Sequence, residues 1–157
     1  MTHPTAEFRL IAMREIAPPA SRPLGDTPEC LHEYWRQQVE QSPKFNPCVE
    51  NLVIAFLNTR RRITGHMVLT NGTLDTLLVH PREVYHAAIL HNAAAIVMMH
   101  NHPSGDPTPS EADIKVTRDL IRAGQLLKIE MLDSIVIGHR ANTPPFASLR
   151  ALGYFYS

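Results

Sequence analysis

The stretch that decides the fold and the chemistry of this chain is HNHPSGDPTPSEAD, residues 100–113, which directly follows the apolar segment 93–99. It holds three side chains of the kinds that bind zinc in proteins, His100, His102 and Asp113. Side chains at i and i+2 of an extended segment point to the same side, so both imidazoles can reach one ion. The pattern therefore predicts a Zn²⁺ site in which Asp113 is the third ligand.

The complete pattern is far more specific than its two histidines. Nine histidines in 157 residues produce roughly half an His-x-His pair per chain by random placement alone. Requiring Ser110 and Asp113 at their spacing as well lowers that expectation to roughly one in a thousand. Chance is therefore a poor explanation of the motif.

The second half of the motif also has the form of a helix start. Ser110 is a typical N-cap, and Glu111 and Asp113 are acids in the first turn, which the helix dipole favours. Without a metal, these residues would be a helix start and nothing more. The two interpretations are compatible, and we expect Ser110 to cap the helix while Asp113 turns toward the histidines. Asp106 lies in an expected turn and is interpreted as a turn residue.

Three protein ligands are the number typical of catalytic zinc. The fourth tetrahedral position is then left to water, whose acidity the ion raises. A structural zinc site would instead be closed by a fourth protein ligand. The sequence offers none close by, although His91 or a distant residue could supply one in space.

The motif resembles that of a known family. His-x-His, seven residues and then Ser-x-x-Asp is similar to the JAMM (JAB/MPN-plus) metallopeptidase motif, and the full string resembles the bacterial RadC branch of that superfamily. The resemblance covers about residues 46–157, where five further segments are similar to RadC: 72–73 (GT), 81–84 (PREV), 92–95 (NAAA), 132–133 (LD) and 135–138 (IVIG).

The resemblance implies an α/β fold, a three-layer α-β-α arrangement with a central mixed sheet, similar to cytidine deaminases. It also implies a zinc-dependent hydrolase that cleaves a peptide or isopeptide bond, with a protein or peptide as substrate. In JAMM enzymes a serine of the motif donates a hydrogen bond to the oxyanion of the attacked carbonyl, and Ser110 matches it. The substrate itself and the oligomeric state stay open.

An upstream glutamate takes the proton from the attacking water in this family, and Glu50 matches that position. Glu50 comes just before the apolar run 52–57, and a carboxylate at a strand start beside the metal strand can reach the bound water. The alternative is a solvated glutamate at a strand end. Glu83 is the rival base, but it follows Pro81 at an expected helix start, where an acid stabilises the helix.

The chain departs from the family pattern at Ser134, where RadC proteins typically carry a histidine after Leu132-Asp133. RadC proteins also have an N-terminal helical region resembling DNA-binding helix-hairpin-helix domains, which we expect this chain to lack. A RadC-type DNA-associated factor in repair or mobile elements is the alternative function, and a metal-binding module without turnover is another. Equal numbers of basic and acidic residues, 15 each, disfavour nucleic-acid binding, and the only dense basic cluster is 60–62.

Composition predicts a compact soluble chain. A hydrophobic content of 44% and a formal charge of zero are ordinary for globular proteins. No apolar run approaches the roughly 20 residues of a membrane helix and no signal peptide opens the chain, so a cytoplasmic location is expected. Cys30 and Cys48 are interpreted as free thiols.

The chain divides at a break over 42–47 into an N-terminal part, 1–45, and the RadC-like JAB/MPN domain, 46–157. In the first part we expect a strand at 7–16, a proline-rich connection, and a helix at 27–41 with Tyr34 and Trp35 in the core. The tail 146–155 is expected to pack back on the domain. The elements expected in the second part are strands at 49–58, 62–70, 74–79, 94–100 and 129–138 and helices at 82–92 and 110–126.

Overall fold

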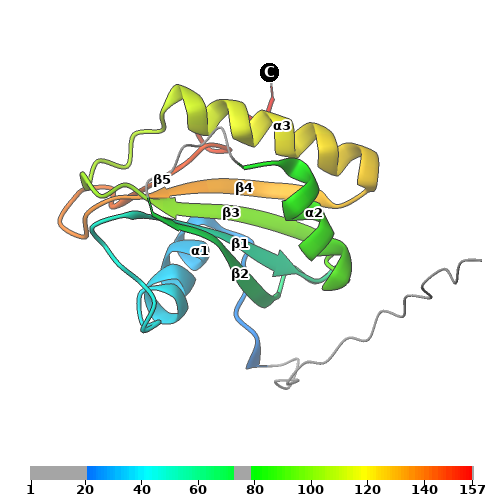
Figure 1. Ribbon diagram of the computed structural model, residues 1–157, viewed down its shortest axis with the longest axis horizontal. Coiled ribbons are helices and arrows are strands. Elements are labelled where there is room, and N and C mark those ends of the chain that lie inside the picture. The colour runs from blue at the N-terminus through cyan, green and yellow to red at the C-terminus, as the bar shows by residue number, and fades with distance from the viewer. Residues whose placement is uncertain (1–20, 73–78, 157) are drawn as a thin grey trace, which may run out of the picture.

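The computed structural model describes residues 21–72 and 79–156, and its centre is a five-stranded mixed sheet (Figure 1). Strands β3 and β4 are parallel and every other pair in the sheet is antiparallel, in the order β2-β1-β3-β4-β5. The strands are β1 (Glu50–Leu57), β2 (Ile63–Gly72), β3 (Ala95–Asn101), β4 (Glu130–Ile137) and β5 (Phe146–Ser148).

Helices cover both faces of this sheet. One face packs against α1 (Pro28–Tyr34), which continues as a π-helical turn, η2 (Trp35–Val39). The other packs against α2 (Pro81–Leu90) and α3 (Glu111–Leu127), as Figure 1 shows. The predicted α/β class with three layers around a mixed sheet is confirmed. None of the described helices is long and apolar enough to span a bilayer.

The two central strands are apolar on both sides because both sides are covered. All residues of β3 are buried, and so is β1 from Asn51 to Leu57. Trp35 and Met99 belong to the core on the α1 face, whereas Met98 belongs to the core under α2 and α3. Polar residues appear in β3 only at its carboxyl end, where the metal motif begins.

Most expected elements lie within a few residues of their expected bounds. The helix expected at 27–41 is α-helical only to Tyr34 and then π-helical, and Tyr34 and Trp35 are buried as expected. The strand expected at 7–16 and residues 74–78 of the strand expected at 74–79 lie outside the described residues, and Val79 is not in a strand. The division near residue 45 stays a prediction.

The tail packs back on the domain, as expected, and it also contributes a strand that the sequence pattern did not indicate. Strand β5 pairs with the end of β4. Buried Asp133 holds it there: its carboxylate accepts hydrogen bonds from the Ser148 hydroxyl (2.6 Å) and the Arg150 backbone N–H (3.1 Å). Burial raises the pKa of Asp133, although these hydrogen bonds act in the opposite direction. The Leu132-Asp133 pair therefore anchors the tail.

The contact of α3 with the neighbouring elements leads to a stability prediction. A Cβ on Gly124 would collide with the Ile129 carbonyl oxygen and the Tyr85 hydroxyl. We expect Gly124→Ala to lower the free energy of unfolding by about 1–3 kcal/mol, because overpacking outweighs the better helix propensity of alanine. The control is Gly65→Ala, where a Cβ meets nothing within 4 Å. Urea unfolding of both variants is the measurement, and equal stability would contradict the close approach.

Candidate metal centre

The histidines of the motif lie where β3 ends. His100 is the last residue but one of β3 and pairs with Val136 of β4. His102 follows directly after the strand. Because Met98 faces the core under α3, alternation along the strand directs His100 and His102 to that same face. The connection from β3 to α3 turns back over the sheet, so the start of α3 lies above the end of β3 (Figure 1).

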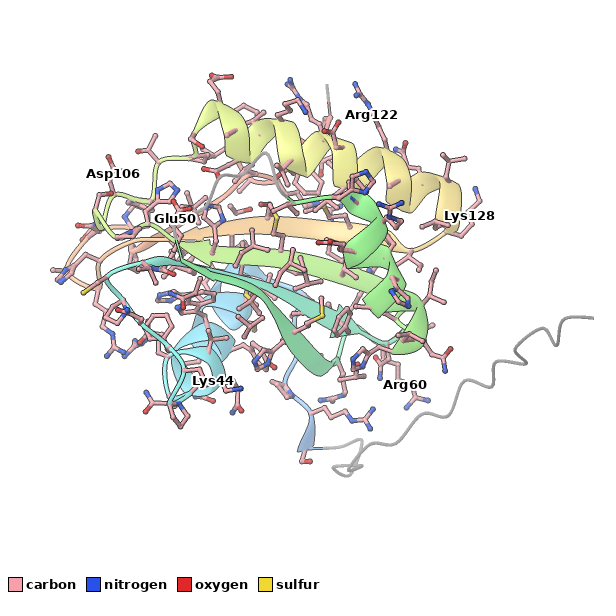
Figure 2. The ribbon with its side chains drawn as sticks, viewed as in Figure 1. Lys44, Glu50, Arg60, Asp106, Arg122 and Lys128 are labelled. Carbon is pink, nitrogen blue, oxygen red and sulfur yellow. The ribbon has the colours of Figure 1, made fainter. Side chains whose placement is uncertain are left out.

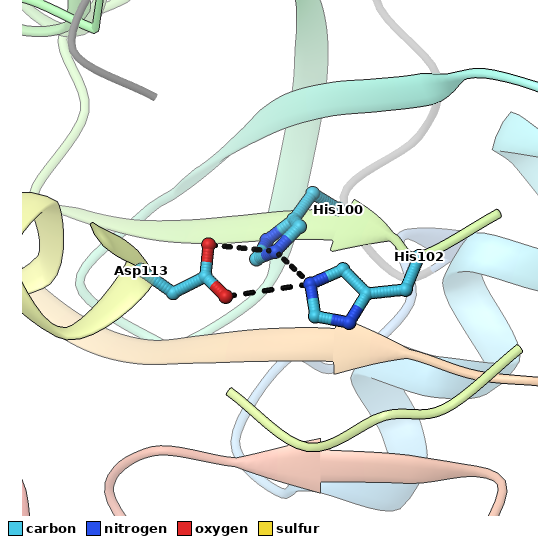
Figure 3. A group of neighbouring side chains, drawn as sticks. All are labelled: His100, His102 and Asp113. Carbon is cyan, nitrogen blue, oxygen red and sulfur yellow. Dashed lines mark hydrogen bonds and ion pairs between the residues drawn. The ribbon is translucent and has the colours of Figure 1, made fainter. Parts of the chain in front are cut away.

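Asp113, in the first turn of α3, faces both imidazoles (Figure 3). Its Oδ1 lies 3.1 Å from His100 Nε2, and its Oδ2 lies 3.3 Å from His102 Nε2. The two Nε2 atoms are 3.2 Å apart. One ligand atom from each residue lies within 4.8 Å of the others, so the three side chains form a group that can hold a metal ion.

The helix start fixes the direction of the Asp113 side chain. The Ser110 hydroxyl oxygen accepts the Asp113 backbone N–H (3.1 Å), and Asp113 Oδ2 accepts the Ser110 backbone N–H (2.7 Å). This reciprocal capping box satisfies two backbone donors that a helix start leaves unpaired. The carboxylate of Asp113 therefore caps the helix and faces the histidines at the same time.

A backbone contact fixes the orientation of the second imidazole. Nδ1 of His102 donates to the carbonyl oxygen of Asp106 at 2.8 Å, which leaves the lone pair of Nε2 directed at the group. The Asp106 carboxylate itself accepts from the Thr108 backbone N–H and hydroxyl in an exposed turn. Asp106 is thus placed as a turn residue, with its carbonyl supporting His102.

The charges in the group favour an ionised carboxylate beside the imidazoles. Burial alone would raise the pKa of Asp113, but the hydrogen bonds that His100 and His102 donate when their rings carry a proton on Nε2 outweigh it and hold the pKa well below its ordinary range. The hydrogen bond to Asp113 raises the pKa of His102, against the effect of burial, and the negative charge of Glu50 adds to the increase.

Glu50 lies at the same edge of the sheet as the histidines. Leu52 pairs with His100 across the antiparallel β1–β3 ladder, so Glu50, two residues earlier, is level with His102 and on the same face. Its side chain is half-buried. Figure 2 shows Glu50 at the end of the sheet where the loop carrying Asp106 turns.

Two buried asparagines that were not among the predicted site residues hold this edge together. Asn101 Oδ1 accepts from the Asn51 backbone N–H (2.8 Å) and side chain (3.0 Å), and Asn101 Nδ2 donates to the Val49 carbonyl (3.0 Å). The residues on either side of Glu50 are therefore tied to the residue between the histidines. The sequence shows only that Asn51 and Asn101 each lie beside an apolar run, and nothing in it indicates that their side chains meet.

Other candidates are placed elsewhere. His91 stacks on Phe56, with ring centroids 4.3 Å apart, near the opposite end of β1, and so adds no fourth ligand. Glu83 is exposed in the first turn of α2, the place expected for a helix-stabilising acid. Among the described residues, the only such group of metal-binding side chains is the one formed by His100, His102 and Asp113.

A cavity of about 560 Å³ opens beside His102 on the α1 side of the sheet end. Asn101 and Gly105 line it next to the motif, and Trp35 and Phe45 line it from the N-terminal helix and the loop after it. An ion pair between Arg140 and Glu40 also borders it. Of the three residues in the metal-binding group, only His102 lines this cavity.

These features define a class of protein: a JAB-type domain whose sheet end carries a His-x-His and Asp group able to bind a metal. The family model of the RadC-like JAB domain matches residues 26–154, and the chain belongs to this family.

The chain is similar to UPF0758 proteins from several bacteria. It is 44% identical to one of Chlorobaculum tepidum over 109 residues, which is 69% of this chain and 47% of the relative. It is 45% identical to one of Bacillus cereus strain G9842 over 105 residues, 67% of this chain and 45% of the relative. For Caldanaerobacter subterraneus the identity is 42% over 106 residues, 68% and 44%. The match thus spans about half the length of these curated relatives.

The geometry predicts metal content. We expect the purified protein to hold about one zinc per chain and Asp113→Ala to lose most of it, because one of only three ligands is removed. The matched control is Asp119→Ala on the same helix, whose carboxylate pairs with Lys115 and Arg122. Elemental analysis measures zinc, and circular dichroism checks that both variants fold. Unchanged zinc in Asp113→Ala would reduce Asp113 to a helix-start residue.

Proposed function

We propose that this chain is a zinc-dependent hydrolase of the JAMM type that cleaves a peptide or isopeptide bond. The observation that carries the proposal is the convergence of the His100 and His102 Nε2 atoms on the Asp113 carboxylate within a RadC-like JAB domain. The protein or peptide substrate is part of the same proposal.

The residues fit Zn²⁺ by their chemistry. Two imidazole nitrogens and one carboxylate oxygen form a typical set of three catalytic zinc ligands, and the tautomer of His102 is already the one that ligation needs. When bound, zinc supplies Lewis acidity and lowers the pKa of a water in the fourth position.

Glu50 is the proposed general base. Its carboxylate faces the same side of the sheet as the histidines, level with His102, and is half-buried. There it takes a proton from the attacking water and passes it to the leaving nitrogen, as a general base that becomes a general acid. The asparagine pair beside it limits how far the start of β1 can move.

Ser110 is the proposed donor to the oxyanion. Its hydroxyl oxygen accepts the Asp113 backbone N–H, which uses a lone pair and leaves the hydroxyl proton free to donate. The side chain is exposed at the start of α3, where the helix dipole also favours negative charge. Capping and oxyanion binding are thus compatible in one residue.

The cavity beside His102 supports a chain-like substrate. Its volume accommodates a few residues, and its apolar lining by Trp35 and Phe45 suits burial of a substrate side chain beside His102. A metal-binding module without turnover would need neither this space nor a carboxylate placed like Glu50.

A base variant tests the catalytic part. Glu50→Gln should keep zinc and fold but slow hydrolysis about 100-fold or more, the scale of lost proton transfer. The assay incubates the zinc-loaded protein with a proteome and reads new N-termini by mass spectrometry. Glu83→Gln is the matched control and should keep wild-type cleavage. Full activity in Glu50→Gln would transfer the base role to another carboxylate.

The alternative function, a DNA-associated factor, has weaker support. In the cluster at 60–62, Arg61 pairs with Glu130 (2.8 Å) and Arg62 donates to the Arg22 carbonyl (2.6 Å). These contacts occupy two of the three guanidinium groups that phosphates would need. The formal net charge of zero adds no general attraction to nucleic acid.

We therefore expect duplex DNA binding no tighter than the nonspecific level, about 10⁻⁴ to 10⁻⁶ M at physiological salt. Fluorescence anisotropy across a salt series measures it. Replacing Arg60, Arg61 and Arg62 by alanine should weaken whatever binding exists, whereas Lys115→Ala with Arg122→Ala on α3 should change it less. Submicromolar binding at physiological salt would favour the DNA-associated alternative.

A further inference from the structure

Three buried polar atoms near the candidate metal centre lack a hydrogen-bond partner among the described residues. They are Nδ1 of His100, Oγ1 of Thr117 and Oγ of Ser134. The three residues are 1%, 0% and 0% exposed. Buried polar atoms are nearly always paired with protein or with ordered water, because an unpaired one is costly. Three unpaired atoms in one region indicate that the same hydrogen-bond network serves all three.

The strand register places Ser134 one row behind His100. In the parallel β3–β4 ladder His100 is beside Val136, and Ser134 is beside Met98, two residues earlier on both strands. Val136 packs against Ile114 of α3, so alternation directs Ser134 toward α3 as well. His100 and Ser134 therefore face the same layer.

Thr117 of α3 faces the same space between the sheet and the helix. It is buried one turn after Asp113 on α3, and residues four apart share one face of a helix. Helix α3 runs back along the sheet against the direction of β3 (Figure 1). Four helix residues rise about 6 Å, which matches the rise of about 6.6 Å over two strand residues. With Asp113 above His100, Thr117 therefore lies above the row of Ser134.

We infer that Thr117 and Ser134 are positioning residues for His100. Their hydroxyls accept the proton on His100 Nδ1 through one internal water, because no direct hydrogen bond joins the three atoms, and Nε2 then keeps its lone pair for the metal. A buried water characteristically joins about three such groups. The inference rests on the proposed function in taking Nε2 of His100 as a metal ligand.

The two imidazoles are then supported in different ways. His102 has a backbone carbonyl as the acceptor for its Nδ1 proton, and this acceptor survives any side-chain substitution. Nδ1 of His100 has no hydrogen-bond partner among the described residues, so its support comes from the side-chain hydroxyls that we assign to it. The ligand inside the sheet is therefore the one that point mutations can disorient.

The test uses a double variant, Thr117→Val with Ser134→Ala, which removes both hydroxyls with little change of shape. A rescue variant, Thr117→Ser with Ser134→Thr, keeps both. Thr64→Val is the matched control, because its hydroxyl bonds to the Phe56 carbonyl on another strand. If the double variant does not fold, the two single variants give the same readout.

Nitrogen-15 NMR of the protein at saturating zinc follows the Nδ1 proton of His100, because without the ion Nε2 faces the Asp113 carboxylate at 3.1 Å. We expect this proton to exchange slowly with solvent in wild type, rescue and control, and faster in the double variant. The affinity for zinc, from competition with a chelator, should fall about 10- to 100-fold in the double variant alone.

The two readouts separate the two claims. Unchanged proton exchange or unchanged zinc affinity in the double variant would overturn the positioning role. Zinc binding with the expected exchange but no cleavage would overturn the proposed function alone, and failure of the wild type to bind zinc would overturn both.

Discussion

The carboxylate of Asp113 is the constraint on which the rest of this structure depends. It is buried at 3% exposure, and a buried charge is stable only when it is paired and hydrogen-bonded. Its partners come from two elements: the imidazoles at the end of β3 and the backbone N–H at the start of α3. The contacts of this one carboxylate therefore hold the end of β3 against the start of α3. The loop between the two elements must turn back to join them.

The neighbouring elements follow from this junction. Apolar residues of β1 and β3 fill the middle of the sheet, and polar side chains gather at its ends. At the motif end, the Asn51–Asn101 contact brings the start of β1 to the histidines. In the middle of β4, Asp133 holds the tail. Stability comes from the apolar centre, and the positions of the functional groups come from the polar ends.

The parts that the sequence allowed us to predict are local ones. His100, His102 and Asp113 lie within one short stretch, and apolar periodicity indicated β3 and α3 on either side of it. Glu50 is fifty residues away and was suggested only by family resemblance; the register of β1 places it at the right edge, and its catalytic role stays a prediction. Residues that depend on distant partners were missed. Nothing in the sequence pairs Asn51 with Asn101 or Arg61 with Glu130, and β5 is three residues long and held by a side-chain contact.

X-ray absorption at the zinc K edge of the zinc-loaded protein tests the central claim most directly, because it reports which atoms surround the ion. Our account predicts two imidazole rings and light O or N neighbours at about 2.0–2.2 Å in a four-coordinate shell, and loss of the two-imidazole signal when His100 and His102 are replaced. Sulfur neighbours at about 2.3 Å would instead assign the zinc to the free cysteines Cys30 and Cys48. Such a spectrum, or one with no imidazole, would contradict the site described for this chain.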